Sequence, residues 1–201
     1  MAAHGGFNHV EFLANGEIVV RPITMPQESL RCLNARLMLF YTGVKRTAST
    51  VAASYVNGIK DRRRELRIMQ DLVKESLAVL SSGKDLSIFG ELMHEAWLAK
   101  RRLSDMVSNP FVDEIYENAL AAGAGGGKLL GAGGGGFMLL FVPPQFHEQV
   151  KQRLHKLIWV PFRFEFNGSQ IIFLDHEEDF SDLVRVQSDI TPFRELVETS
   201  D

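Results

Sequence analysis

The sequence predicts an α+β fold, because strand patterns lie at both ends of the chain and helical patterns lie between them. Residues 7–12 and 17–23 open the chain as two strands around Asn15-Gly16, a two-residue hairpin signal. Helix-like segments follow between residues 48 and 122, and residues 160–166 alternate apolar and polar again. With 201 residues and 45% apolar content, one domain with its own core is the default expectation.

Composition narrows the classes of function. A formal net charge of -3 argues against non-specific nucleic-acid binding, which needs a basic surface. Cys32 is the single cysteine, so no intramolecular disulfide can form, and a reducing compartment is favoured. The first residues have no signal-peptide pattern, and no apolar run approaches the roughly 20 residues that cross a bilayer. We therefore expect a cytoplasmic protein without nucleic-acid or membrane partners.

The middle of the chain predicts a buried strand and three further helices. The apolar run 37–41 is typical of a strand covered on both faces. Gly83 lies just past the end of the first helix, Asp85 opens the second, and Asn109-Pro110 begins the third, which Gly123 ends. The charged triplets 62–64 and 100–102 are interpreted as solvated faces, with contact to an anionic ligand as the less favoured alternative. The two apolar stripes are Leu66, Met69, Val73, Leu77 and Leu80, then Leu86, Phe89, Met93, Trp97 and Leu103.

The last third predicts a strand at 136–142, a helix after Pro143-Pro144, and strands at 160–166 and 171–174. From Asp175 onward the chain carries nine acidic residues against Arg185 and Arg194. This tail is either an interaction segment or a loosely ordered extension, and its composition favours the extension.

Glycine is concentrated at one place, since nine of the 17 glycines lie between Gly123 and Gly136. Glycine reaches positive φ without steric cost and lets another group approach bare backbone. A flexible linker would be polar, whereas this segment is bracketed by Lys128-Leu-Leu and a buried-looking strand. The pattern therefore favours a loop whose N–H groups converge on an anion, or whose backbone packs against a phosphate-binding loop.

A second candidate anion site follows the strand 37–41, where Thr42 to Thr47 precede a helix-like segment. An equally weighted alternative is that Thr47 caps the helix while Lys45 and Arg46 are solvated. Other motifs fail. The glycines match G-x-G-x-x-G, but a strand follows where a helix is required; His94-Glu95 lacks the closing histidine of H-E-x-x-H, and no G-x-S-x-G occurs. We predict no catalytic residue and no metal ligands from these patterns.

The string from Ala121 to Phe137 resembles the third motif of the GHMP kinases, the family of galactokinase, homoserine kinase and mevalonate kinase. Within that family it is most similar to the sugar kinases of D-glycero-D-manno-heptose 7-phosphate. The resemblance spans His4 to about Leu174, and its other strings are His4-Gly-Gly-Phe-Asn8, Leu39-Phe-Tyr-Thr-Gly43, Asn109-Pro110 and Phe164-Glu-Phe-Asn-Gly-Ser-Gln-Ile-Ile172.

The resemblance implies a ferredoxin-like C-terminal domain at 31–174, an antiparallel sheet covered by helices. Residues 1–30 would be the end of the N-terminal kinase domain, left as a β-hairpin, and 175–201 an acidic tail. It also implies transfer of the γ-phosphoryl group of ATP to a sugar-phosphate hydroxyl with magnesium. Thr42 and Arg46 would face the sugar phosphate. The nucleotide phosphates would lie beside Lys128, Gly131, Ala132, Gly133, Gly134 and Gly135.

The sequence also departs from the family. It lacks the Gly/Ser-rich ATP-binding loop and the Asp-Gln pair that holds the catalytic aspartate, which are expected before His4. We therefore expect a truncated or split C-terminal half that is inactive alone, with a separate N-terminal half or a second copy as partner. The alternatives are a non-catalytic module that binds a sugar phosphate or nucleotide, and a plain interaction domain.

Overall fold

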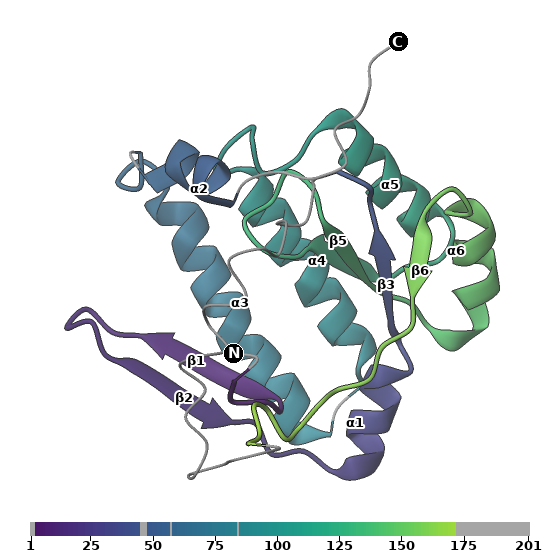
Figure 1. Cartoon of the computed structure of the whole chain (residues 1–201), viewed down its shortest axis with the longest axis horizontal. Coiled ribbons are helices and arrows are strands. Elements are labelled where there is room, and N and C mark those ends of the chain that lie inside the picture. The colour runs from purple at the N-terminus through teal and green to yellow at the C-terminus, as the bar shows by residue number, and fades with distance from the viewer. Residues whose placement is uncertain (1–2, 45–47, 57, 84, 172–201) are drawn as a thin grey trace, which may run out of the picture.

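A computed structural model describes residues 3–44, 48–56, 58–83 and 85–171 (Figure 1). The predictions for Lys45 to Thr47, for the strand at 171–174 beyond Ile171, and for the acidic tail lie outside the described residues. Among the described helices, none combines the length and hydropathy that a membrane crossing requires.

The centre of the fold is a four-stranded antiparallel sheet with the order β4-β5-β3-β6. Counted along the sheet-forming part of the chain, the first and third strands are central and the second and fourth are at the edges. This is the ferredoxin-like order, and it confirms the predicted α+β class. The strands are β3 (Leu37–Tyr41), β4 (Gly126–Leu129), β5 (Phe137–Phe141) and β6 (Ile158–Val160).

Helices cover one face of this sheet. Successive side chains of a strand point to opposite faces, so every second residue of β3 is buried under the helices. Met38 and Phe40 of β3 and Met138 and Leu140 of β5 are almost fully buried and join a cluster with residues of α4, α5 and α6. Trp97 of α4 has no exposed surface in this cluster. The helices are α1 (Gln27–Asn34), α2 (Ala48–Val56), α3 (Arg63–Ser82), α4 (Ser87–Arg101), α5 (Pro110–Ala121) and α6 (His147–Arg153), which follows the 3-10 turn η1 (Pro144–Phe146).

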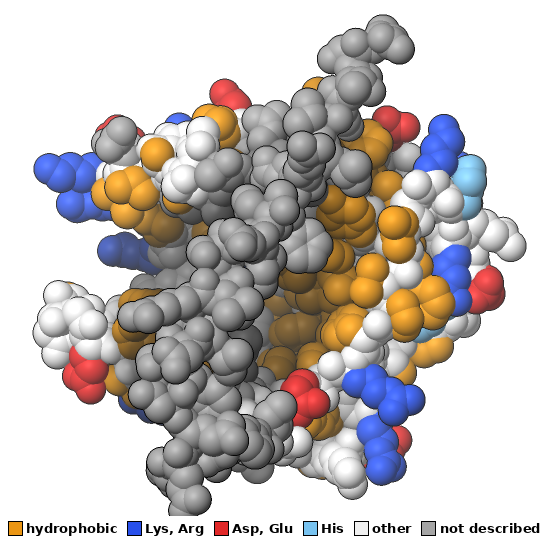
Figure 2. Space-filling view, viewed as in Figure 1, with side chains coloured by type: hydrophobic (Ala, Val, Ile, Leu, Met, Phe, Trp, Pro, Cys, Tyr) orange, Lys and Arg blue, Asp and Glu red, His pale blue; other side chains and the backbone are white. Residues whose placement is uncertain are grey.

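The opposite face of the sheet is partly open. Tyr41 pairs with Phe137 on one side and Ile158 on the other, so the three side chains share one face. Phe137 is 40% exposed and Ile158 is 64% exposed. Figure 2 shows hydrophobic side chains gathered in this region of the molecule.

A separate two-stranded sheet precedes the main one. Its strands are β1 (Asn8–Phe12) and β2 (Ile18–Pro22), paired antiparallel, and they lie beside α3 in Figure 1. The predicted hairpin is confirmed, but the two-residue turn was wrong: the link runs from Leu13 to Glu17, with a hydrogen bond from the Leu13 amide to the Glu17 carbonyl (2.9 Å). The Asn15 side chain accepts from the Glu17 amide (3.0 Å), and this bond favours the longer turn.

Three of the predicted helix ends are confirmed, whereas α4 begins at Ser87 and not at the predicted Asp85. Gly83 follows α3 in the left-handed conformation, with φ of 63°. Asn109 caps α5 by accepting from the Val112 amide, and Pro110 is the first helical residue. Gly123, with φ of 100°, follows the end of α5.

The strand predicted at 160–166 was wrong for most of its length, since β6 ends at Val160. Pro161 has no N–H to donate to a ladder, and the chain then leaves the sheet. Asn34 of α1 holds the segment that follows: its side chain accepts from the Phe164 amide (3.2 Å) and donates to the Phe162 carbonyl (3.5 Å). The division of the chain at residue 30 stays a prediction, and this position falls within α1.

Candidate phosphate-binding site

The glycine-rich segment is a β-hairpin connection between β4 and β5. Lys128 pairs with Leu139 and Leu129 with Met138, and the Leu130 amide donates to the Phe137 carbonyl (2.8 Å). Part of the predicted loop is therefore strand, which corrects the sequence-based interpretation. A Cβ on Gly126 would lie 2.0 Å from the Gly90 carbonyl oxygen, so this glycine lets β4 pack against α4 and does not belong to an anion loop.

The loop proper, residues 130–136, is held by two backbone segments. The Gly134 amide donates to the Val107 carbonyl (2.9 Å) and the Gly136 amide donates to the Val44 carbonyl (2.8 Å). A Cβ on Gly133 would lie 2.6 Å from the Val107 oxygen, and one on Gly135 would lie 2.4 Å from the Val44 oxygen. The glycines thus allow close approach on two sides, which gives the loop a fixed shape.

Asn109 joins the start of α5 to the same loop. Its amide nitrogen donates to the Gly134 carbonyl (3.0 Å), while its side-chain oxygen accepts from the Val112 amide (3.0 Å). One side chain therefore fixes both a helix N-terminus and the middle of the loop.

We expect Asn109→Ala to lower the free energy of unfolding by about 1–3 kcal/mol, because the helix cap and the bond to Gly134 are both lost. Asn109→Ser keeps a cap acceptor, loses the donor to Gly134 and places no charge against the Gly134 oxygen, so it should lie between Asn109→Ala and the unsubstituted protein in urea-induced unfolding. A serine variant as unstable as the alanine variant would show that the cap contributes little.

Several loop amides are left for a ligand. The N–H groups of Gly131, Ala132, Gly133 and Gly135 have no hydrogen-bond partner among the residues that the structure describes. Gly131 is exposed, with a φ of 74°. Successive backbone N–H groups in a turn with residues at positive φ form a concave anion site.

Lys128 brings a positive charge to the sheet face next to this loop. It lies opposite Leu139 and lines a cavity of about 510 Å³ between the β1–β2 hairpin, α3, α4 and the sheet. Burial lowers the pKa of Lys128, because a charged amine is costly to desolvate.

Lys100 lies in the last turn of α4, and the sequence pattern favoured a solvated position for it. Its ammonium group donates to the Gly131 carbonyl (2.5 Å). Burial, and then the nearby charge of Lys128, lower the pKa of Lys100 to about 8. The interpretation of residues 100–102 as a solvated face was wrong here, and wrong also for Arg101, which pairs with Asp113 (2.8 Å).

Thr42 lies at the far end of the loop and is only 3% exposed. Its hydroxyl donates to the Gly136 carbonyl (2.9 Å), and its amide donates to the same oxygen (2.9 Å). These bonds tie the end of β3 to the start of β5. The predicted contact of Thr42 and Arg46 with a sugar phosphate stays a prediction, and Arg46 lies outside the described residues.

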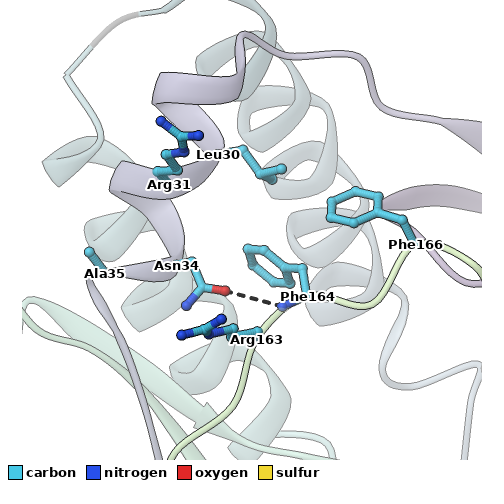
Figure 3. A pocket seen from close by; sticks show the side chains of 7 residues that line it. All are labelled: Leu30, Arg31, Asn34, Ala35, Arg163, Phe164 and Phe166. Atoms are coloured by element: carbon cyan, nitrogen blue, oxygen red, sulfur yellow. Dashed lines mark hydrogen bonds between the residues drawn. The ribbon is translucent and has the colours of Figure 1, made fainter.

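A second cleft, of about 430 Å³, lies between α1 and residues 163–166 (Figure 3). Leu30 and two phenylalanines line it, and the guanidinium groups of Arg31 and Arg163 point away from each other instead of converging on one ligand position. None of the loop residues lines this cleft, so we assign it no part in the phosphate site.

Sequence comparison relates the chain to known kinases. Residues 68–157 match the family described as GHMP kinases C terminal. The D-glycero-alpha-D-manno-heptose 7-phosphate kinase of Campylobacter jejuni is 32% identical over 147 residues, which are 71% of this chain and 42% of that protein.

Solved structures agree with the fold. A D-glycero-D-manno-heptose 1-phosphate kinase from Bacteroides thetaiotaomicron has a TM-score of 0.60 at 24% identity, over 86% of this chain and 47% of its own. A putative sugar kinase from Campylobacter jejuni has a TM-score of 0.57 at 29% identity, over 83% of this chain and 48% of its own. The chain thus spans less than half the length of each of these relatives. Within that span, residues 68–157 match the C-terminal domain of the GHMP kinases, and the chain is similar to the sugar kinases of that family.

Proposed function

We propose that this chain supplies the phosphate-binding part of an ATP-dependent sugar kinase that acts on D-glycero-D-manno-heptose 7-phosphate. The observation that carries the proposal is the loop at 130–136. Backbone and Asn109 fix its shape, and four of its amides point to no described partner. The similarity to a heptose 7-phosphate kinase supports the choice of substrate. A single cysteine, Cys32, fits work in a reducing cytoplasm.

The loop suits the chemistry of phosphoryl transfer, which depends mainly on positioning and on charge neutralisation. The N–H groups of Gly131, Ala132 and Gly133 would donate to phosphate oxygens, and Lys128 would offset their charge. Magnesium would neutralise charge on the transferred group. No three metal-binding side chains gather in the described part of the chain, so the ion would be held largely by the phosphates themselves.

Transfer also needs a group that orients the accepting hydroxyl. No carboxylate of the described residues forms a hydrogen bond with residues 130–136. We therefore propose that the chain by itself binds nucleotide but transfers phosphate hardly at all. The carboxylate would come from a separate N-terminal half, which would pack against residues 1–30 and the ferredoxin-like part at 31–174, or from a second copy.

Calorimetry with ATP-magnesium tests the binding step, and a coupled assay with D-glycero-D-manno-heptose 7-phosphate tests turnover. We expect binding without turnover from the 201-residue chain, and turnover after a candidate N-terminal half is added. Clear turnover by the chain alone, lost in Gly133→Val, would contradict its proposed inactivity. Failure to bind nucleotide both by the chain alone and with the N-terminal half added would contradict the kinase function.

The alternative is a non-catalytic module that binds a sugar phosphate or nucleotide. The observation that favours it is that no carboxylate of the described residues forms a hydrogen bond with the loop. Tight binding that no added half converts into turnover would support this alternative.

A further inference from the structure

Two lysines lie beside the loop without an acidic partner. Lys100 comes from α4 and Lys128 from β4, and neither forms an ion pair within the described residues. The next residue along α4, Arg101, shows the contrast, because Asp113 neutralises it at 2.8 Å.

This arrangement is costly in the protein alone. Both amines are partly buried, and each loses hydration that an opposite charge would normally replace. The positive charge of Lys128 adds repulsion at Lys100. Unpaired like charges in a partly desolvated place are typical of a site that binds an opposite charge.

The geometry shows where that charge would sit. An ammonium group has three donors, and the bond to the Gly131 carbonyl uses one of those of Lys100. No described residue accepts from the two remaining donors, and the amides of Gly131 and Ala132, at the same end of the loop, have no described partner either.

We propose that Lys100 and Lys128 together form an anion site at the start of the glycine loop, and that this site takes one phosphate group of the ligand. Lys100 contacts the phosphate and also holds the Gly131 carbonyl. The inference rests on the proposed function for the kind of ligand, and it adds Lys100 to the residues that bind it. The phosphate belongs either to the nucleotide or to the sugar phosphate.

The two possible roles of Lys100, as an unpaired charge and as a support for the loop, predict opposite effects of its replacement on stability. Lys100→Gln removes the charge but keeps an amide donor for Gly131, so at pH 7 we expect Tm to rise by about 2–4 °C. If Lys100 only supported the loop, its replacement would lower Tm. The lowered pKa means that the folded state disfavours the proton: the penalty is complete below pH 8 and is relieved as pH rises toward 10.5. The difference in Tm between the two proteins should therefore close over that range.

Binding of ATP-magnesium, inorganic tripolyphosphate and D-glycero-D-manno-heptose 7-phosphate to the full chain tests the site. We expect Lys100→Gln and Lys100→Met each to weaken binding of the cognate phosphate about 10- to 100-fold. Arg102→Gln is the matched control, because Arg102 is exposed and forms no ion pair with the described residues; it should leave binding unchanged.

The outcomes separate this inference from the kinase function. Loss confined to ATP and tripolyphosphate assigns the site to the nucleotide, and loss confined to the heptose phosphate assigns it to the sugar; both support the inference. Equal binding of all three probes by the unsubstituted protein and both Lys100 variants would overturn the inference and leave the kinase function standing. Tripolyphosphate binding that needs Lys100, without any ATP binding, would support the site and contradict the kinase function. If no probe binds the unsubstituted protein, both are contradicted.

Discussion

Gly126→Ala is expected to lower the free energy of unfolding by about 3–5 kcal/mol or to prevent folding. The added Cβ would lie 2.0 Å from the Gly90 oxygen and 3.0 Å from the His94 nitrogen, and both atoms are backbone of α4. No side-chain rotation relieves such contacts, so β4 and α4 would have to separate. Urea-induced unfolding followed by circular dichroism measures the loss.

The neighbouring glycine gives a matched control for Gly126. A Cβ on Gly125 would meet the Phe141 ring at 3.5 Å, which is ordinary contact, and its φ lies outside the positive range. We expect Gly125→Ala to change stability by less than about 1 kcal/mol. A Gly126→Ala midpoint as close to the unsubstituted protein as that of Gly125→Ala would show that the helix and the strand are not packed as described.

Gly133→Val is expected to have the second-largest effect, because two costs add at one position. The φ of 122° is strained for any side chain, and most for a β-branched one. The Cβ would also lie 2.6 Å from the Val107 oxygen. We expect a loss of about 2–4 kcal/mol in the free energy of unfolding and at least a 10-fold loss of phosphate binding, measured by calorimetry on the folded fraction.

Gly136→Ala separates the two costs. Gly136 has a φ of 99°, but open space surrounds the position of its Cβ. Backbone strain should therefore lower the free energy of unfolding of this variant by about 1–2 kcal/mol, with no contribution from a steric clash. If Gly136→Ala proves as damaging as Gly133→Val, backbone strain alone explains both, and the contact with Val107 does not hold the loop.

Local signals were enough to predict some elements of the fold. Asn109, Pro110 and Gly123 mark the start and end of α5 through bonds and dihedral angles made within a few residues, so the sequence predicts this helix closely. Gly83 does the same for the end of α3. The glycine loop could also be predicted from the sequence, because its glycine content is unlike that of the rest of the chain.

Other elements depend on contacts between distant residues. In α1 only two leucines, Leu30 and Leu33, stand at helical spacing, and a stripe of two residues is too short to predict the helix without the second core cluster that packs around Leu33. Gly126 and Gly127 have low strand propensity and become strand through pairing with β5. In the sequence Lys100 is one of three consecutive basic residues, which is typical of an exposed face. Its contact with Gly131 comes from a loop 31 residues further along the chain, so no local pattern predicts it.

Two loop amides, those of Gly136 and Gly134, donate to the main-chain oxygens of Val44 and Val107, so these two hydrogen bonds do not depend on the identity of either side chain. Every amino acid has a main-chain carbonyl group, so the residue at 44 or 107 can change as far as core packing and backbone conformation permit. What cannot vary freely is spacing: one inserted or deleted residue near 44 or 107 would shift the oxygen that the loop amide reaches. Homologous chains should therefore keep constant segment lengths at both places even where their letters differ.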